Sequence, residues 1–313
     1  MDRPLRVQLL EYPGAQQSAL WGMKDLLDTA SSEAATVGAD VFKTKIGNAP
    51  GGDEDIVILP PALLVEPPVL QTDWKAMLVR HHAAGGVLAS VCAGAFLLAD
   101  AGVLDGRRVT THWRHEAALR ERHPKVIIDT RRLLVDLGDV VTAGGVMAWT
   151  DLTLHMIQRF GGRKLMLNVA RLFVLDPPER EQSYYATFTP SKAHGDSGVA
   201  KVQDLMLETV GETHTIASLA AAGAMSERSF LRRFKNATGE TPVAYLQLLR
   251  VEAARSRLEL TRESFEGISW GVGYTDAAAF RRIFKRRVGL TPSEYRARFG
   301  MGDAIMPGEG KGL

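Results

Sequence analysis

The chain has 313 residues, 45% of them hydrophobic, which is enough apolar material for two cored domains of ordinary size. Its single cysteine excludes an intramolecular disulfide or a cysteine-based metal cluster, and no apolar run is long enough for a signal peptide or a membrane span, so we expect a cytoplasmic protein. The formal net charge is +2, but residues 201–300 carry 16 lysines and arginines against 11 acidic residues, so a basic segment follows a slightly acidic one.

Residues 5–175 alternate short apolar runs with segments of helical periodicity. The runs that we interpret as buried strands are 5–10, 56–59, 87–91 and 140–143. The segments that we interpret as helices are 18–30, 72–84, 94–101 and 149–160. Strands that alternate with helices favour a parallel sheet covered on both faces. We therefore predict a flavodoxin-like, doubly wound α/β domain over residues 1–180.

Cys92 stands where the third predicted strand should meet a helix, in the run Ser-Val-Cys-Ala-Gly at 90–94. Helix N-terminal amides favour a thiolate, and small neighbours allow the sharp turn of a nucleophile elbow. His112 ends the next apolar run and would activate the thiol if the two side chains met; otherwise it is a pocket wall or a structural histidine. Three roles for Cys92 stay open: part of a ligand pocket, a buried small apolar side chain, or a nucleophile or redox sensor.

The alternating pattern ends near residue 176. Asp-Pro-Pro-Glu at 176–179 precedes a polar, aromatic stretch, and His-Gly-Asp-Ser-Gly follows at 194–198. Such punctuation is typical of a connection between domains. We place a linker at 181–200, a wholly helical domain at 201–300 and a disordered, glycine-rich tail at 301–313.

The helical segment contains an internal repeat. The pattern FxxxF, GxTPxxY that begins at Phe230 recurs 50 residues later from Phe280. Each copy holds a short apolar helix, a glycine-containing turn and a second helix, which is the helix-turn-helix pattern. The second helices are expected at 227–237, capped by Ser226, and at 276–287, capped by Thr275.

Each of these second helices has an apolar face and a basic face at the 3.6-residue period. The residues that we expect to contact DNA are Arg228, Arg232 and Lys235 in the first copy, and Ala278, Arg281, Arg282, Lys285 and Arg286 in the second. Arginine can bind guanine in the major groove, a small residue can touch a thymine methyl, and lysine can neutralise phosphates. A solvated basic surface is the alternative for any one of them, but two symmetric basic faces favour DNA.

Residues 203–299 resemble the AraC/XylS family of transcriptional regulators, and the pattern FKxxxGxTPxxYR at 284–296 carries the resemblance. The resemblance implies one domain that reads two major-groove segments about one helical turn, ~10 bp, apart. It implies base-reading positions at Arg228, Arg232, Ala278 and Arg282. In the first turn the glycine stands one place earlier than in the family pattern, so we predict backbone strain at Ala224.

Residues 5–175 resemble the PfpI-type branch of the class I glutamine-amidotransferase-like superfamily, including the sensor domain of GlxA-type AraC regulators. The matching runs are SVCAG at 90–94, LADAGVLDG at 98–106, TTHW at 110–113, TAGG at 142–145 and DLTLH at 151–155. The resemblance implies dimerisation and a ligand pocket whose wall includes Cys92, His112, Trp113 and Gly144. Enzymes of the superfamily have an acidic residue after the first strand, whereas the matching segment 14–19 has none, which disfavours hydrolysis.

We therefore predict a homodimeric transcriptional regulator that binds promoter DNA and responds to a small-molecule effector such as an amino-acid or amine metabolite. We expect no catalytic residue, no cofactor, no metal site and no membrane association. Two alternatives stay open. One is a cysteine-dependent amidase or hydrolase fused to a DNA-binding domain, and the other is a constitutive architectural DNA-binding protein.

Overall fold

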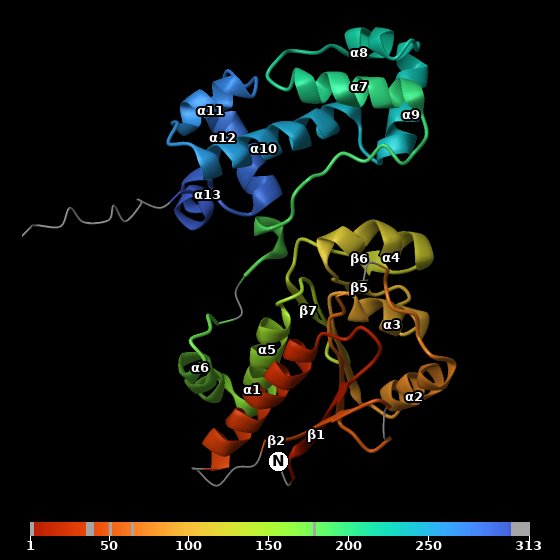
Figure 1. The fold of residues 1–313 in the computed structure, drawn as a ribbon, viewed down its shortest axis with the longest axis vertical. Helices are drawn as coiled ribbons and strands as arrows, with labels where there is room; N and C mark the ends of the chain where they lie inside the picture. Colours follow the sequence, from red (N-terminus) through yellow and green to blue (C-terminus); the bar gives the residue numbers. More distant parts are fainter. Residues whose placement is uncertain (1–2, 36–40, 50–51, 64–65, 178–179, 302–313) are drawn as a thin grey trace, which may run out of the picture. The chain divides into compact units, whose positions relative to one another are not determined.

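The computed structural model describes residues 3–35, 41–49, 52–63, 66–177 and 180–301, drawn in colour in Figure 1. The chain forms two compact units, Met1–Ser183 and Tyr184–Leu313. The first is the N-terminal unit and the second the C-terminal unit. This boundary lies three residues beyond the predicted end of the α/β domain. Apart from Met301, the predicted disordered tail at 301–313 lies outside the described residues.

A six-stranded sheet in the order β2-β1-β3-β4-β8-β7 forms the centre of the N-terminal unit. Its strands are β1 (Leu5–Leu10), β2 (Phe42–Gly47), β3 (Ile56–Leu59), β4 (Val87–Val91), β7 (Leu134–Asp136) and β8 (Val140–Ala143). A separate pair consists of β5 (Arg108–Val109) and β6 (Ile127–Ile128). The four predicted strands are confirmed with their bounds, since central strands buried on both faces are continuous apolar runs.

The two strands of the main sheet that the sequence analysis missed, β2 and β7, lie at its edges. In β2, Lys43 and Lys45 are exposed, and charged residues of this kind protect a free edge from pairing with another chain. The three-residue β7 runs antiparallel to β8, whereas the other neighbours are parallel. The sheet is therefore mixed, and the prediction of a parallel sheet was wrong at this edge.

Helices cover both faces of the sheet, as predicted for a doubly wound domain (Figure 1). They are α1 (Gln17–Ala35), α2 (Thr72–Ala83), α3 (Gly94–Asp100), α4 (Glu116–Arg122), α5 (Trp149–Gly161) and α6 (Arg163–Leu172), with 3-10 helices η1 (Trp113–His115) and η2 (Gln182–Tyr184). Helices α1, α5 and α6 pack on one another on one side, and α2 and α3 contact β4 on the other. The fold class is therefore confirmed for this unit.

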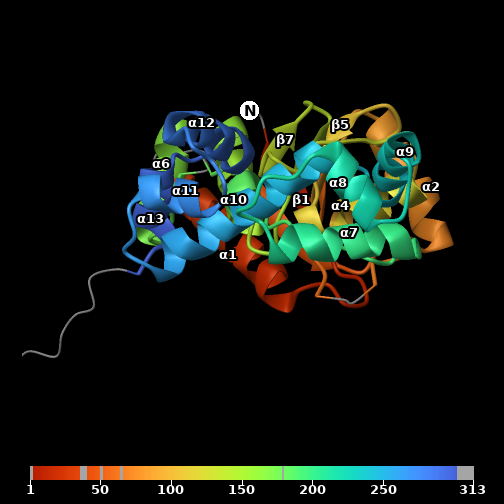
Figure 2. The ribbon, with the colours of Figure 1, turned by 90° about the horizontal axis from the view of Figure 1, so that it is seen from above.

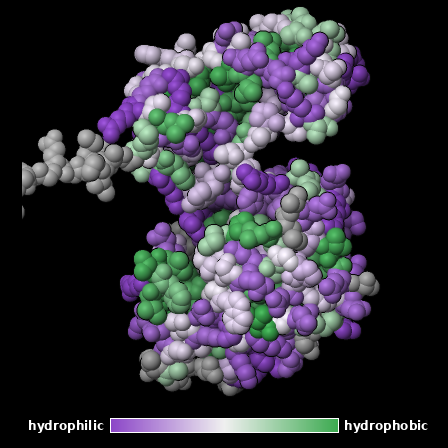
Figure 3. All heavy atoms as spheres, viewed as in Figure 1, coloured by the Kyte–Doolittle hydropathy of each residue, from purple (hydrophilic) through white to green (hydrophobic). Residues whose placement is uncertain are grey.

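Apolar side chains gather on the surface of the N-terminal unit over α6, on the face drawn in Figure 3. Leu172, Phe173 and Val174 are all exposed at the end of this helix. Val174 also has a φ of +54°, which is strained for a β-branched residue. A contiguous exposed apolar surface of this kind is typical of an association site.

The C-terminal unit is helical, as predicted. Its helices are α7 (Ser197–Glu208), α8 (Ile216–Ala222), α9 (Glu227–Thr238), α10 (Pro242–Leu260), α11 (Phe265–Gly271), α12 (Ala277–Val288) and α13 (Pro292–Phe299). Figures 1 and 2 show α7–α9 at one end of α10 and α11–α13 at the other. Tyr245 and Leu249 of α10 are buried with the first group, and Val251 and Leu258 with the second. One helix therefore supplies part of both cores.

Several residues of the linker predicted at 181–200 form contacts within one of the two units. Gln182 is buried in the N-terminal unit, and α7 already begins at Ser197, where the Asp196 carboxylate accepts the Val199 amide at 3.0 Å. The Phe188 ring packs at 5.1 Å on the Tyr245 ring of α10. Aromatic and polar residues without periodicity resemble a linker in sequence, but here they serve as anchors.

Candidate functional site

Helices α9 and α12 each divide into a buried and an exposed face. Phe230 and Phe234 of α9 are fully buried, and so are Phe280 and Phe284 of α12. The residues that we expected to contact DNA are all exposed: Arg228, Arg232, Lys235, Ala278, Arg281, Arg282, Lys285 and Arg286. The 3.6-residue period therefore predicted the orientation of both helices correctly.

The arginines near the two exposed faces differ in whether they have partners. Arg281 pairs with Glu266 at 3.1 Å, and its guanidinium lies 5.4 Å from the centre of the Phe265 ring. By contrast, Arg228, Arg232 and Arg282 form no ion pair with any residue that the structure describes. An unpaired, exposed guanidinium can bind a nucleic acid without breaking a contact of the folded protein.

Both helices begin at a side-chain cap. The Ser226 hydroxyl accepts the Ser229 amide at 3.4 Å, which confirms the predicted cap of α9. The cap of α12 is Asp276 and not Thr275, which corrects the prediction. The Asp276 carboxylate accepts the amides of residues 278 and 279 at 2.8 and 3.0 Å. A carboxylate that binds two amides and faces the positive end of the helix is a stronger cap than a hydroxyl one residue earlier.

The two helix-turn-helix copies differ in the length of the turn. The caps of their first helices, Thr215 and Ser264, are 49 residues apart, whereas the caps of α9 and α12 are 50 residues apart. The longer second turn places Gly273 at a φ of +85°, but the shorter first turn places Ala224 at +54°. Since this region favours glycine, the strain predicted at Ala224 is confirmed.

Cys92 joins β4 to α3 at the carboxyl edge of the sheet. Its φ of +54° gives the sharp turn that its small neighbours predict. The thiol side chain is buried, and this burial raises its pKa to about 11, against the smaller opposite effect of the Ala93 amide. The amide at the start of α3 favours the thiolate, as expected, but the loss of hydration outweighs it and the net shift of the pKa is upward.

His112 is hydrogen-bonded to the neighbouring backbone and not to the Cys92 thiol, among the described residues. Its Nδ1 accepts the Arg114 amide at 3.1 Å, and among the described residues no hydrogen bond joins it to the thiol. Burial, together with His115 and Arg114, lowers the pKa of His112 to about 4. The imidazole is therefore neutral near pH 7, and its ring lies beside Trp113, with centroids 5.4 Å apart.

Backbone contacts hold the predicted pocket residues together. The Thr111 hydroxyl donates to the Cys92 carbonyl at 2.7 Å. The Gln182 carboxamide accepts the Trp113 amide at 2.9 Å, and a Cβ at Gly144 would lie only 2.5 Å from its Nε2. Cys92, Trp113 and Gly144 therefore border one polar core. Sequence reasoning missed Gln182, because a single glutamine in an aperiodic stretch matches no motif.

Tyr12 is a second residue at this edge that sequence reasoning missed. It follows β1, is buried, and donates its hydroxyl to the Pro60 carbonyl at 2.5 Å. Burial raises its pKa, and the nearby Cys92 raises it further. A neutral phenol and a neutral thiol therefore lie close together where an enzyme of this type would need ionised groups.

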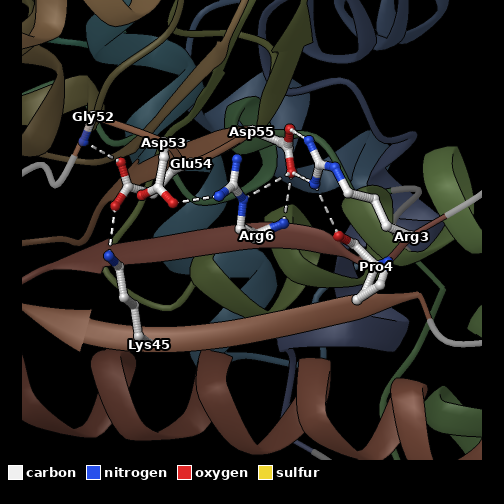
Figure 4. Close-up of polar contacts among 8 residues, drawn as sticks. All are labelled: Arg3, Pro4, Arg6, Lys45, Gly52, Asp53, Glu54 and Asp55. Atoms are coloured by element: carbon white, nitrogen blue, oxygen red, sulfur yellow. Dashed lines mark hydrogen bonds and ion pairs between the residues drawn. The ribbon is translucent and has the colours of Figure 1, made fainter.

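A different polar cluster closes the amino edge of the sheet (Figure 4). Asp55 accepts hydrogen bonds from the Arg3 guanidinium at 2.6 and 2.7 Å and from the Arg6 amide at 2.8 Å. These bonds lower the pKa of Asp55 to about 2. The buried Glu54 carboxylate pairs with Lys45 at 2.6 Å. A cavity of about 560 Å³ borders the cluster, but both carboxylates already have cationic partners.

The described ranges contain neither a metal-ligand cluster nor a membrane-spanning helix. No three His, Cys, Asp or Glu side chains come together there as a metal site. None of the helices in those ranges is both long and apolar enough to cross a bilayer.

Known proteins match both units. Residues 219–298 match the family described as Helix-turn-helix domain, and residues 28–159 match the DJ-1/PfpI family. The chain is 32% identical over 272 residues to the HTH-type transcriptional regulator Rv1931c of Mycobacterium tuberculosis, a match that covers 80% of this chain and 97% of that protein.

Two other relatives bear the same kind of name. The HTH-type transcriptional regulator GbdR of Pseudomonas aeruginosa is 28% identical over 225 residues, covering 71% of this chain, and the chain spans only 60% of GbdR. The HTH-type transcriptional regulator GlxA of Rhizobium meliloti is 27% identical over 239 residues, covering 73% of this chain and 72% of that protein. The predicted resemblance to GlxA-type regulators is therefore confirmed.

The strained turn at Ala224 predicts a gain in stability on substitution. Ala224→Gly should raise the free energy of unfolding of the C-terminal unit by about 0.5–1 kcal/mol, because glycine adopts positive φ without the cost of a Cβ. Ala222→Gly, in the regular last turn of α8, should lower it by up to about 1 kcal/mol. Urea denaturation of both variants checks this, and equal destabilisation would contradict it.

The buried thiol predicts slow alkylation. Because the thiolate is the nucleophile and the pKa of Cys92 is about 11, iodoacetamide labelling near neutral pH should be on the order of a hundredfold slower in the folded chain than in urea. Below the unfolded-state pKa both states are protonated, so the difference in ionisation should shrink only as the pH rises toward 11. Mass spectrometry gives the labelling rate. Rapid labelling of the folded chain would support the enzyme alternative.

Proposed function

Because the chain belongs to the family of HTH-type transcriptional regulators that join a DJ-1/PfpI domain to an AraC-type helix-turn-helix domain, we propose that it binds promoter DNA through α9 and α12. We propose that a small molecule held by the N-terminal unit adjusts this binding. The observation that carries the DNA proposal is the exposed, unpaired state of Arg228, Arg232 and Arg282 on two capped helices.

In this proposal the two basic helices enter successive major grooves. Arg228 and Arg232 of α9 and Arg282 of α12 bind base edges, and Ala278 touches a thymine methyl group. The other exposed basic residues contact phosphates: Lys235, Arg281, Lys285 and Arg286. The shared helix α10 supports this proposal, because both helices pack on cores that it fills. The net positive charge of residues 201–300 supplies the salt-dependent attraction.

The proposed ligand site lies at the carboxyl edge of the sheet, where Cys92, Trp113 and Gly144 border one polar core and the His112 ring lies beside Trp113. Ligands of open α/β sheets bind at this edge. A neutral imidazole and thiol offer hydrogen bonds without fixed charge, and Trp113 offers an aromatic face. These groups suit a small polar metabolite such as an amino acid or an amine.

We propose a sensor and not a hydrolase for the N-terminal unit. Three features support this: a protonated, buried thiol, a histidine whose Nδ1 is bound to a backbone amide, and a segment 14–19 without a carboxylate. A thiol hydrolase needs a thiolate next to a base. We also propose that the chain acts in the cytoplasm as a homodimer, which the exposed apolar end of α6 supports.

Footprinting tests the proposed function. The full chain should protect two adjacent major-groove segments on the promoter that flanks its own gene, and the pattern or affinity should change with one of a panel of amino acids and amines. Affinity that is indifferent to every metabolite would favour an architectural DNA-binding protein. Absence of any protected site would overturn the proposal.

Arg282→Ala should weaken binding to the footprinted site by about 1–3 kcal/mol and relax base preference at one position, because a bidentate contact to guanine is lost. Lys201→Ala, an exposed charge on α7 away from the basic helix faces, is the matched control and should change binding little. Gel shifts on specific and random duplexes measure both. Equal weakening on random DNA would make Arg282 a phosphate contact.

A further inference from the structure

The last residues of the N-terminal unit are fastened by one buried carboxamide. Gln182 is only 2% exposed. Its Oε1 accepts the Trp113 amide at 2.9 Å, and its Nε2 donates to the carbonyls of Thr111 and Thr130 at 3.0 and 2.8 Å. Both N–H groups of the carboxamide and its oxygen are therefore used. Any movement of Gln182 leaves three backbone groups to find other partners.

An ion pair and a backbone hydrogen bond hold the residues beside Gln182 on the N-terminal unit. Arg180 binds the carboxylate of Asp151 with two of its nitrogens, one of them at 3.1 Å, and that carboxylate is almost completely buried. The Ser183 amide donates to the Arg131 carbonyl at 3.1 Å. Residues 180–183 thus form a continuous anchored segment on the N-terminal unit.

Gln182 lies where the candidate ligand residues meet. It binds the backbone of Trp113 directly, and it binds Thr111, whose hydroxyl holds the Cys92 carbonyl at 2.7 Å. Gly144 also packs closely here, because a Cβ at this position would lie 2.5 Å from the carboxamide nitrogen of Gln182 and 2.7 Å from the Thr111 carbonyl oxygen. A ligand that shifts these loops therefore shifts the hydrogen-bond partners of Gln182.

The residues that follow Ser183 form their contacts with the C-terminal unit. The Tyr185 hydroxyl accepts a hydrogen bond from Arg298 at 2.9 Å, and its ring contacts Phe299 with centroids 5.5 Å apart. Arg255, itself buried, donates to the Ala186 carbonyl. Ser183, the last anchor of the N-terminal unit, and Tyr185, the first named anchor of the C-terminal unit, are therefore separated by Tyr184 alone.

We propose that Gln182 is a latch that couples the ligand residues to the DNA-binding unit. In the seated state the Gln182 carboxamide keeps its three hydrogen bonds, and the segment 180–183 is fixed on the N-terminal unit. In the open state the Thr111–Trp113 loop has moved and these bonds are broken. The segment that leads into the C-terminal unit is then released from the N-terminal unit. A ligand acts on this equilibrium through different affinities for the seated and open states. The regulatory part of this inference rests on the proposed function.

Two variants and a control test the seating of the latch in the full chain. Gln182→Ala removes the carboxamide, and Gln182→Met removes its hydrogen bonds while keeping most of its volume. Gln17→Ala is the control, since Gln17 is exposed and its carboxamide bonds Glu11 at 2.9 Å and no other described side chain. Both latch variants should exchange the Trp113 amide proton at least tenfold faster and be cleaved by trypsin after Arg180 at least tenfold faster. Rates within twofold of the wild type in folded variants would overturn the latch.

A second measurement separates coupling from simple anchoring. The affinity of each full-length variant for a duplex from the promoter ahead of its own gene should change at least fivefold, whereas Gln17→Ala should leave it unchanged. Faster exchange with unchanged DNA affinity would overturn the coupling and leave Gln182 as a structural anchor. Failure of the wild type to bind the duplex would overturn the proposed function and the regulatory part of the inference, while the exchange rates would still decide whether the latch is seated.

Discussion

Helix α10 is buried twice along its length, and the arrangement of the C-terminal unit depends on this double burial. Its first half fills the core of α7–α9 with Tyr245 and Leu249, and its second half fills the core of α11–α13 with Val251 and Leu258. A helix that contributes to two cores cannot rotate about its axis without opening one of them. Packing on α10 therefore fixes the orientation of the basic faces of α9 and α12. The spacing of the proposed DNA contacts follows from this packing.

The carboxyl edge of the N-terminal unit combines a sharp backbone turn with buried side chains that hold no charge near pH 7. Cys92 keeps the sharp backbone turn of a nucleophile elbow, yet its thiol is protonated because desolvation outweighs the helix amides. The nearby groups are neutral too: the Tyr12 phenol has a raised pKa and His112 a lowered one. Uncharged groups of this kind can still donate and accept hydrogen bonds, which is the property that the proposed ligand site uses.

Predictions from sequence succeeded where one physical term dominates. Central strands such as Ile56–Leu59 are buried on both faces, so their apolar runs are unambiguous, and the faces of α9 and α12 follow from helical periodicity. Predictions from sequence failed where two structures or two side chains compete for the same position. Edge strand β2 mixes lysines with apolar residues, and Asp276 prevails over Thr275 as a cap through a second amide. The role of Gln182 depends on backbone groups contributed by loops distant in sequence, which no local pattern encodes.

The anchored connector has a consequence for the modular history and engineering of such regulators. Composition suggests a loose joint anywhere between residues 176 and 200, but Gln182 belongs to one unit and Tyr185, Ala186 and Phe188 to the other. A chimaera joined before Gln182 would leave the N-terminal unit without the carboxamide that binds Thr111. A chimaera joined after Phe188 would leave the aromatic residues of this stretch without their partners in the C-terminal unit. Exchange of N-terminal units between relatives therefore has to keep Gln182 with one unit and Tyr185, Ala186 and Phe188 with the other. A junction at the boundary after Ser183 separates these anchors, although it falls within the 3-10 helix Gln182–Tyr184.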